Sequence, residues 1–290
     1  MIYFTLSLES SRQLSFLKRD LGRTARRAFA SGSWSNLRTQ IKAYVLFTTY
    51  FKLQFLPATL DIVCLYATFL SRSFRSPQSI RNYISGLKFL HILLGHEYRF
   101  TSDYVLSLVF RGIEKTLRHV PVRARPVTPA ILHAMAAAVN FEDFEDVTCL
   151  CAAVFMFSLM ARAGNVFVRA DQGLHFGLKR KHVRCEGDVM LITFKSTKTI
   201  QCGKRVLHIP MVASPASTIC PVALYNLMIQ FTPDRPPSTP LFAVLDGDCC
   251  FPMSKAGFLS RFRVLLGKAG IPHPEAFSCP SFRRGGLLYS

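Results

Sequence analysis

Apolar residues between positions 34 and 118 recur at the three- and four-residue spacing of amphipathic helices. One such segment covers 34–50 and a second covers 60–70, and Pro57 interrupts the helical pattern between them. A further segment covers about 102–118. Together with the helix described next, this pattern predicts a four-helix unit.

The helix between these segments has the clearest boundaries in the chain. Ser76 is a residue type that caps helices, and Pro77 fits a first helical turn. Gly95 is suited to end the helix. The apolar stripe between these limits consists of Ile80, Tyr83, Ile84, Leu87, Leu90 and Leu94.

Three prolines lie close together after this unit, in the string PVRARPVTP at 121–129. Because proline breaks helices and holds an extended chain, this stretch is typical of an interdomain linker. The expected organisation is therefore a basic arm over 1–32, a helical domain over 33–120, a linker over 121–129 and a second domain over 130–290.

The second domain alternates helical and strand-like patterns. Runs over 188–194 and 205–211 have strand character, and a loop with Lys195, Lys198 and Lys204 joins them into a hairpin with a basic tip. The helical segments cover about 128–139, 143–161, 221–231 and 254–269, with a last one starting near 281. The predicted fold class is mainly α with a small β-hairpin or sheet (α+β).

The charge of the chain narrows the choice of partner. It has 36 Lys and Arg against 17 Asp and Glu, and residues 1–125 hold 19 of these basic residues against 6 acidic ones. Such a surface favours a polyanion, with nucleic acid ahead of an anionic membrane or a ribonucleoprotein. The basic stretch 11–30 is a loose or helical arm, or else a solvated tail. The candidate DNA-binding residues are Lys18, Arg19, Arg26, Arg27, Arg38, Lys42, Arg72, Arg75, Arg81, Lys88, Arg123 and Arg125.

Other classes of protein have little support. The nine Cys include no Cys-x-x-Cys pair, which favours buried or free thiols in a reducing compartment. The histidines and cysteines that flank the hairpin fit no common zinc spacing, so no metal or other cofactor is expected. The opening MIYFTLSLES lacks a secretory pattern, and the uncharged stretch 147–161 is shorter than the ~20 residues of a membrane span. Neither a membrane nor a small-molecule substrate is expected.

Three basic residues stand in strings that suggest chemistry only when they are taken together. Arg162 follows a buried helix in FSLMARAGNVF, Lys198 lies in KSTKT at the hairpin tip, and Arg283 lies in SFRRGG near the end of the chain. Each alone is more simply an ordinary helix-terminal or surface residue. Their order and spacing resemble the tyrosine recombinase (phage-integrase-like) pattern: an Arg after a core helix, a Lys on a β-hairpin and a His-x-x-Arg segment.

The helical domain adds to this resemblance. WSNLRTQIKAY, PATLDIVCLYATFLSRS and SPQSIRNYISGLKFLH are similar to the core-binding domain of tyrosine recombinases from invertebrate retroelements. The resemblance spans roughly 33–290. It implies a two-lobed DNA clamp in which a helical core-binding domain precedes a catalytic domain, with duplex DNA as partner and self-association on DNA. A nuclear location follows from the DNA target.

The resemblance also implies a role for each candidate catalytic residue. Arg162 and Arg283 would clamp the scissile phosphate, whose negative charge grows in the transition state. Lys198, with Lys195 as the alternative, would donate the proton to the leaving 5′ oxygen. A tyrosine would be the nucleophile, and the covalent link that it forms removes any need for a metal or nucleotide.

The chain departs from the family pattern at three positions. Pro280 stands where the His of His-x-x-Arg belongs, and Asn165 replaces the usual acidic residue after the first Arg. Tyr289 follows Arg283 too closely to share one phosphate, so the nucleophilic Tyr is absent. The expected protein is therefore a DNA binder from a mobile element, truncated and catalytically incomplete. The alternatives are a fragment of an active site-specific recombinase and a non-enzymatic basic adaptor that retains the fold.

Overall fold

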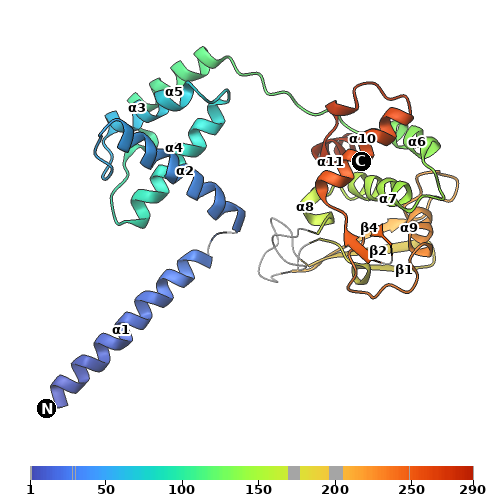
Figure 1. Cartoon of the computed structure of the whole chain (residues 1–290), viewed down its shortest axis with the longest axis horizontal. Helices are drawn as coiled ribbons and strands as arrows, with labels where there is room; N and C mark the ends of the chain where they lie inside the picture. The colour runs from blue at the N-terminus through green and yellow to red at the C-terminus, as the bar shows by residue number, and fades with distance from the viewer. Residues whose placement is uncertain are drawn as a thin grey trace. The chain divides into compact units, whose positions relative to one another are not determined.

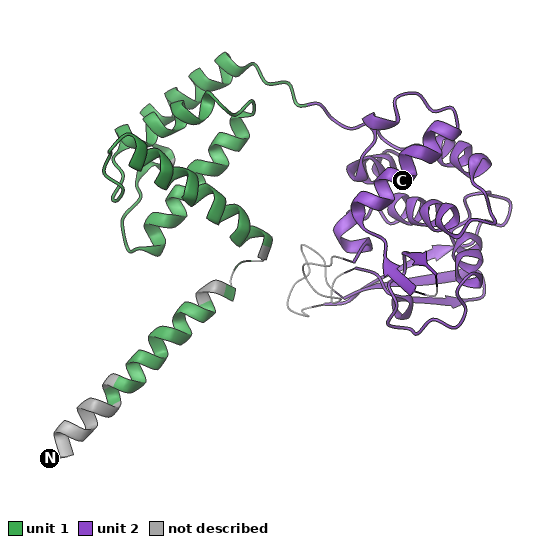
Figure 2. Ribbon diagram, in the orientation of Figure 1, with its two compact units in different colours: residues 1–121 green, residues 122–290 purple. Residues whose placement is uncertain are grey.

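The computed structural model describes residues 2–27, 29, 31–168, 177–195, 205–247 and 249–289. The chain divides into two compact units, Met1–Pro121 and Val122–Ser290 (Figure 2). They are called unit 1 and unit 2 below, and each is described by itself.

Unit 1 is helical. Its elements are α1 (Ile2–Arg27), α2 (Ser31–Tyr50), α3 (Leu60–Ser71), α4 (Pro77–Leu93), a 3₁₀ turn (Phe100–Ser102) and α5 (Tyr104–Leu117) (Figure 1). The helices predicted over 34–50, 60–70 and 102–118 are confirmed within a few residues at each end. Of the alternatives for the basic stretch 11–30, the structure contains a helix, since α1 covers most of it.

The core of unit 1 forms where α2, α3, α4 and α5 pack together. The predicted stripe of α4 supplies four of its buried side chains, namely Ile80, Ile84, Leu87 and Leu90. Tyr83 is only half-buried and Leu94 is exposed. The rings of Tyr44 and Tyr66 pack edge to face inside this core, with 5.1 Å between their centroids.

The predicted boundaries of α4 are confirmed, with one difference at its N-cap. Ser76 occupies the N-cap position of α4, but its side chain makes no capping hydrogen bond. Pro77 still fixes the first turn, because its missing N–H needs no partner there. Gly95 follows the helix with φ +76°, a conformation that glycine adopts without strain.

A buried histidine joins the loop before α3 to α4. The backbone N–H of Ala58 donates to Nε2 of His91 at 2.9 Å, and Nδ1 of the same ring lies 2.9 Å from the carbonyl oxygen of Leu87. Nε2 is therefore the acceptor, and Nδ1 carries the proton that the Leu87 carbonyl accepts. The ring satisfies two backbone groups that the core would otherwise leave unpaired.

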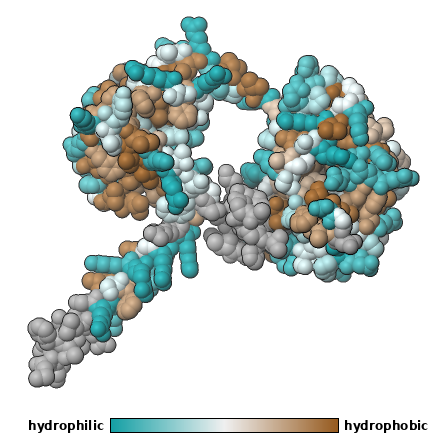
Figure 3. Space-filling model, in the orientation of Figure 1, coloured by the Kyte–Doolittle hydropathy of each residue, from teal (hydrophilic) through white to brown (hydrophobic). Residues whose placement is uncertain are grey.

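Unit 1 also exposes apolar side chains, and Figure 3 shows apolar areas on the face of this unit that is in view. Tyr50 is 79% exposed and contacts Phe51 at 4.9 Å between ring centroids. Phe51 in turn lies 5.8 Å from Phe69. These rings extend the aromatic core outward to the surface.

Unit 2 combines helices with two small antiparallel sheets, which makes the chain mainly α with small β-sheets, as its sequence predicts. The helices are α6 (Pro129–Ala138), α7 (Phe144–Ser158), α8 (Ala163–Val166), α9 (Pro221–Gln230), α10 (Lys255–Lys268) and α11 (Cys279–Leu288), with 3₁₀ turns at Arg180–His182 and Pro274–Ala276. The strands are β1 (Val183–Glu186), β2 (Val189–Phe194), β3 (Leu207–Val212), β4 (Ala243–Asp246) and β5 (Cys249–Pro252).

The predicted hairpin is present as β2 and β3, which pair from Val189 opposite Val212 to Phe194 opposite Leu207. β1 extends this sheet in the order β1-β2-β3. The β4–β5 pair forms a second sheet, and neither it nor β1 was predicted. Each of these strands has only four residues, too few for an alternating pattern to stand out.

Helix α7 is the centre of unit 2. Its residues from Asp146 to Met156 are all buried, and α6, α9, α10 and α11 pack around it (Figure 1). The ring centroid of Phe282 on α11 lies 4.8 Å from that of Phe262 and 5.6 Å from that of Phe258. These contacts fix α11 against α10. The sequence correctly indicated a buried helix here.

The prediction that this helix runs to 161 and that Arg162 closes it is wrong. α7 ends at Ser158, and Met160 adopts a left-handed conformation with φ +48°. Arg162 is extended (φ −78°, ψ 141°) and occupies the N-cap position of α8. It therefore lies at the start of a short helix rather than at the carbonyl end of a long one.

An ionic network ties the beginning of α7 to α10. Asp146 is fully buried, and its carboxylate accepts from Arg261 Nε at 2.6 Å and from the backbone N–H of Asn140 at 3.2 Å. Lys268 Nζ lies 3.8 Å from the same carboxylate, and Asp143 also pairs with Arg261. A buried carboxylate is stable only with such partners.

The described residues contain no helix long and apolar enough to cross a membrane, and no group of three or more His, Cys, Asp or Glu that could hold a metal ion. The cysteines in the same ranges are free thiols. Burial raises the pKa of Cys149 and Cys151 far above the ordinary value, which suits a core thiol and not a reactive one. Of the histidines and cysteines that flank the hairpin, His175 and Cys202 lie outside the described residues.

Candidate nucleic-acid interface

A cavity of 810 Å³ in unit 2 collects four basic side chains. Arg162 comes from the start of α8, Lys255 from the start of α10, and Arg283 and Arg284 from α11. Two of them, Arg162 and Arg283, are the pair that the sequence predicts for a phosphate clamp. The cavity therefore brings together residues that are far apart in the chain.

Local packing directs Arg162 into this cavity. Its neighbours Ala161 and Ala163 are buried, whereas Arg162 is exposed, so the turn after α7 holds the backbone while the guanidinium stays accessible. The carbonyl of Arg162 accepts the N–H of Asn165 at 2.8 Å. The side chain of Arg162 makes no hydrogen bond that caps α8.

Two glycines allow α11 to carry Arg283 to the same place. A Cβ on Gly285 would overlap the carbonyl oxygen of Val127, and one on Gly286 would overlap that of Phe157 at the end of α7. The N–H of Val127 donates to the carbonyl of Ser281 at 3.1 Å. Helix α11 therefore packs directly on the backbone that precedes α6 and on the end of α7.

The electrostatics of the cavity favour an anion. Arg284 donates to the carbonyl of Ala124, which holds one guanidinium in place. Within the described ranges, no carboxylate lies within ion-pair distance of Arg162, Lys255, Arg283 or Arg284. Several unpaired cations around one cavity give a positive potential that a phosphate group can neutralise.

The structure does not test the first choice of proton donor. Lys198 lies outside the described residues. Lys195, the alternative, is exposed at the end of β2 and is not among the residues that line the cavity. The charge of Lys195 instead affects His182. Burial is the main cause that lowers the pKa of His182, and the charges of Lys195, Lys181 and Lys179 lower it further.

The departures from the family pattern also have definite positions. Pro280 lines the cavity in the first turn of α11, where the family pattern has its His. Tyr289 follows the last turn of α11, is 59% exposed and does not line the cavity.

Sequence reasoning missed Lys255 and gave Arg284 no role. Lys255 follows Ser254, whose side chain caps α10 by accepting the N–H of Gly257 at 2.9 Å. This cap predicts a helix start but not what the helix faces. The pattern SFRRGG contained no clear signal for Arg284, since adjacent glycines more often mark a turn than a helix that packs closely on its neighbours.

The candidate DNA-binding residues are mostly exposed. On α1, Lys18, Arg19 and Arg27 are exposed, while the side chain of Arg26 lies outside the described set. Arg38 and Lys42 are exposed on α2, and so are Arg72, Arg75, Arg123 and Arg125 in the connecting segments. Lys88 is half-buried on α4.

Among the candidates that the structure describes, Arg81 is the one whose guanidinium forms an ion pair. Its guanidinium pairs with Glu114 at 2.8 Å and lies 4.2 Å from the centroid of the Phe110 ring. This arrangement fastens α4 to α5 and offsets the charge of Arg81. It is therefore a weaker candidate for phosphate binding than Arg72 or Arg75.

No family model matches the sequence, and no curated protein matches it. Among solved structures, the fold is similar to XerH site-specific recombinase bound to difH substrate in a pre-cleavage complex, with 14% identity and a TM-score of 0.47 over 80% of this chain and 60% of that chain. A second similar structure is XerH bound to palindromic difH substrate in a post-cleavage complex, with 15% identity and a TM-score of 0.45 over 79% of this chain and 60% of that chain. The chain spans 60% of the length of these recombinases.

Proposed function

We propose that this chain is a duplex-DNA-binding protein of the tyrosine-recombinase type whose unit 2 holds a backbone phosphate, and that its own residues do not complete strand cleavage. The observation that carries the proposal is the cavity shared by Arg162 and Arg283. The proposal includes an origin in a mobile element and action in the nucleus, both of which come from the sequence resemblance.

The chemistry of the cavity suits a phosphodiester. A guanidinium presents paired N–H donors that match two non-bridging oxygens of one phosphate. Arg162 and Arg283 supply such forks from different elements, and Lys255 adds a compact charge. Because charge on those oxygens grows during cleavage, the same groups would stabilise the transition state more than the ground state.

The residues at two positions support the proposal that this chain does not cleave DNA. Pro280 can neither donate nor accept a side-chain proton where the family pattern has His. Tyr289 follows Arg283 by a rise of ~9 Å and on another face of the helix, and it does not line the cavity. The phosphate clamp is therefore proposed to bind DNA without a nucleophile aligned to it.

Binding to a labelled duplex over a salt series tests the DNA-binding part of this proposal. A protein that neutralises several phosphates should lose affinity with a log–log slope of about −0.9 per contact, so six contacts predict a loss of roughly a thousandfold from 50 to 200 mM salt. A chain without duplex affinity, or with affinity that salt hardly changes, would contradict the proposal and favour the non-enzymatic adaptor.

A nicked suicide duplex tests the cleavage part separately. A nucleophilic tyrosine would leave a covalent protein–DNA adduct that survives denaturing electrophoresis. We expect no adduct from residues 1–290, at DNA concentrations that saturate binding. An adduct would contradict the proposed incompleteness, and its loss in Tyr289→Phe would identify the nucleophile.

A further inference from the structure

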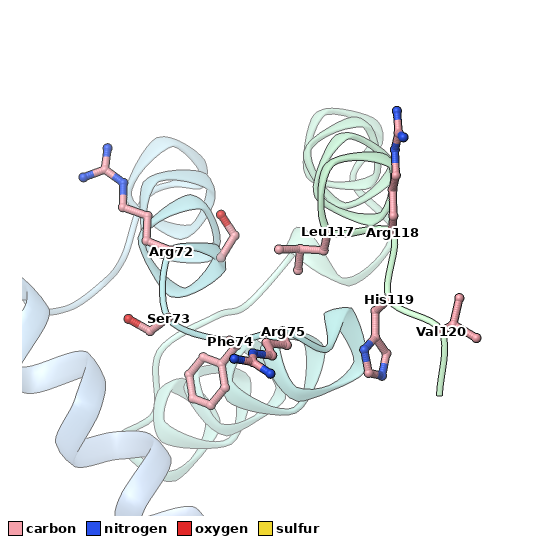
Figure 4. Close-up of a pocket in the computed structure, with 9 residues that line it drawn as sticks. Arg72, Ser73, Phe74, Arg75, Leu117, Arg118, His119 and Val120 are labelled. Carbon is pink, nitrogen blue, oxygen red and sulfur yellow. The ribbon is translucent and has the colours of Figure 1, made fainter. Parts of the chain in front are cut away.

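Unit 1 has a basic cavity of its own. It has a volume of 570 Å³ and lies between the end of α3, the turn before α4 and the end of α5. The cationic side chains of its lining are Arg72, Arg75 and Arg118, with His119 beside them (Figure 4). These four residues are called the arginine pocket here, and the sequence indicated only the first two.

The pocket is open and its charges lie at the rim. Figure 4 shows Phe74 and Arg75 in the turn before α4, and Arg72 and Arg118 extending outward from two separate helix ends. Arg72, Arg75, Arg118 and His119 are all exposed. Such an arrangement suits an extended polyanion that lies across the rim better than a small anion held inside.

The charges of the pocket are not offset by acidic neighbours. No carboxylate in the described ranges pairs with Arg72, Arg75 or Arg118. Glu114, one turn before Arg118 on α5, is already paired with Arg81 at 2.8 Å. The arginines therefore remain available for an external anion.

The backbone at Arg118 has a conformation that is unusual for a residue with a side chain. Arg118 caps α5 with φ 45° and ψ 37°, the left-handed conformation that helix ends usually assign to glycine or asparagine. For a residue with a Cβ, this conformation costs roughly 1 kcal/mol of conformational free energy. Fold stability favours glycine at this position, so Arg118→Gly can remove the charge without a loss of stability.

We propose that the arginine pocket binds a phosphate of a duplex DNA backbone, as a contact of unit 1 that is additional to the cavity of unit 2. This inference rests on the proposed DNA-binding function. It assigns phosphate contacts to Arg118 and His119, which have no other partner in the described structure, and it groups them with Arg72 and Arg75.

A matched pair of glycine variants tests the proposal in the full-length chain. Arg118→Gly removes one charge from the pocket and relieves the left-handed strain. Lys52→Gly removes one charge from the same unit and relieves the same kind of strain, since Lys52 has φ 55° and does not line the pocket. Thermal unfolding should show both variants to be at least as stable as wild type.

Their binding to a labelled duplex over a salt series should differ. We expect Arg118→Gly to weaken binding about fivefold at 0.1 M salt and to reduce the salt slope by about one, while Lys52→Gly changes neither. Equal effects of the two variants, or no effect of Arg118→Gly, would overturn the pocket while leaving duplex binding by the wild type intact. Failure of the wild type to bind any duplex would instead reject the proposed function.

Titration with inorganic phosphate separates the two sources of this ligand. We expect wild type and Arg118→Gly to bind free phosphate equally, because the open rim of the arginine pocket does not enclose a small anion. Tight binding of inorganic phosphate to wild type that is lost in Arg118→Gly would show a free-anion site and overturn the assignment to DNA.

Discussion

The two units hold their positive charge in different ways. In unit 2, buried contacts place four cations around one cavity, and Gly285 allows the close approach of α11 that this requires. In unit 1, most basic residues are exposed along helices and turns, and the arginine pocket opens at its rim. Cations that packing holds around one cavity suit a single phosphate. Cations dispersed over a surface supply affinity along the DNA backbone. The variants below separate these two roles.

The largest effect is expected where packing places the charge. Gly285→Ala would force a Cβ into the carbonyl oxygen of Val127, and backbone cannot yield as a flexible side chain can. We expect unit 2 to lose about 3 kcal/mol of stability, measured by chemical denaturation of the full-length chain.

Gly267→Ala in α10 is the matched control for this substitution. It lies in a helix of the same unit, and nothing approaches its Cβ position within 4 Å. Because alanine has the higher helix propensity, this variant should be up to about 1 kcal/mol more stable than wild type. Destabilisation of equal size in both variants would show that the close approach of α11 is not what makes Gly285 necessary.

The next largest effect is expected on DNA affinity, from unit 1. Replacement of Arg38, Lys42, Arg72 and Arg75 together by Gln removes four exposed charges. At roughly one unit of salt slope per phosphate contact, we expect the slope to fall by three to four and affinity at 0.1 M salt to fall about a hundredfold. Duplex titrations measure both. An unchanged salt slope would mean that these residues of unit 1 do not contact DNA phosphates.

A smaller effect is expected at the ionic network of unit 2. Asp146→Asn keeps the shape of the side chain but removes the buried charge that faces Arg261. We expect a loss of about 2 kcal/mol in the free energy of unfolding, since Arg261 would keep a hydrogen-bond acceptor but lose an ionic partner. Asp188→Asn, in the exposed turn between β1 and β2, should change stability by less than about 0.5 kcal/mol. Similar values for both would show that burial does not decide the contribution.

The sequence predicts the fold best where one face of a long element is buried. The stripe of α4 has this form, because Ile80, Ile84 and Leu87 repeat at helical spacing and all become buried. It fails for short elements: four-residue strands such as β4 show no alternation, and the left-handed turn at Met160 has no glycine to mark it. The end of α7 was therefore placed too late, and Arg162 was assigned to the wrong end of a helix.

The candidate site could be predicted only in part, for a similar reason. Arg162 and Arg283 were recognisable because each stands in a string that resembles a known family. Lys255 stands in no such string, and it reaches the cavity only because α10 packs against α7. Arg118 was equally hidden, since its left-handed backbone is a property of the folded chain.

The smallest effect is expected from the two residues that best define the cavity. Arg162→Ala and Arg283→Ala each remove one guanidinium group from the proposed site of a single phosphate. The other cations of unit 2 and the exposed charges of unit 1 remain. Each variant should therefore weaken duplex binding only about threefold, which corresponds to about 0.7 kcal/mol. The same salt-series titrations measure this loss beside the fourfold Gln variant of unit 1. A severe loss from either clamp variant alone would reverse the comparison, because the grip on DNA would then be concentrated in the cavity of unit 2.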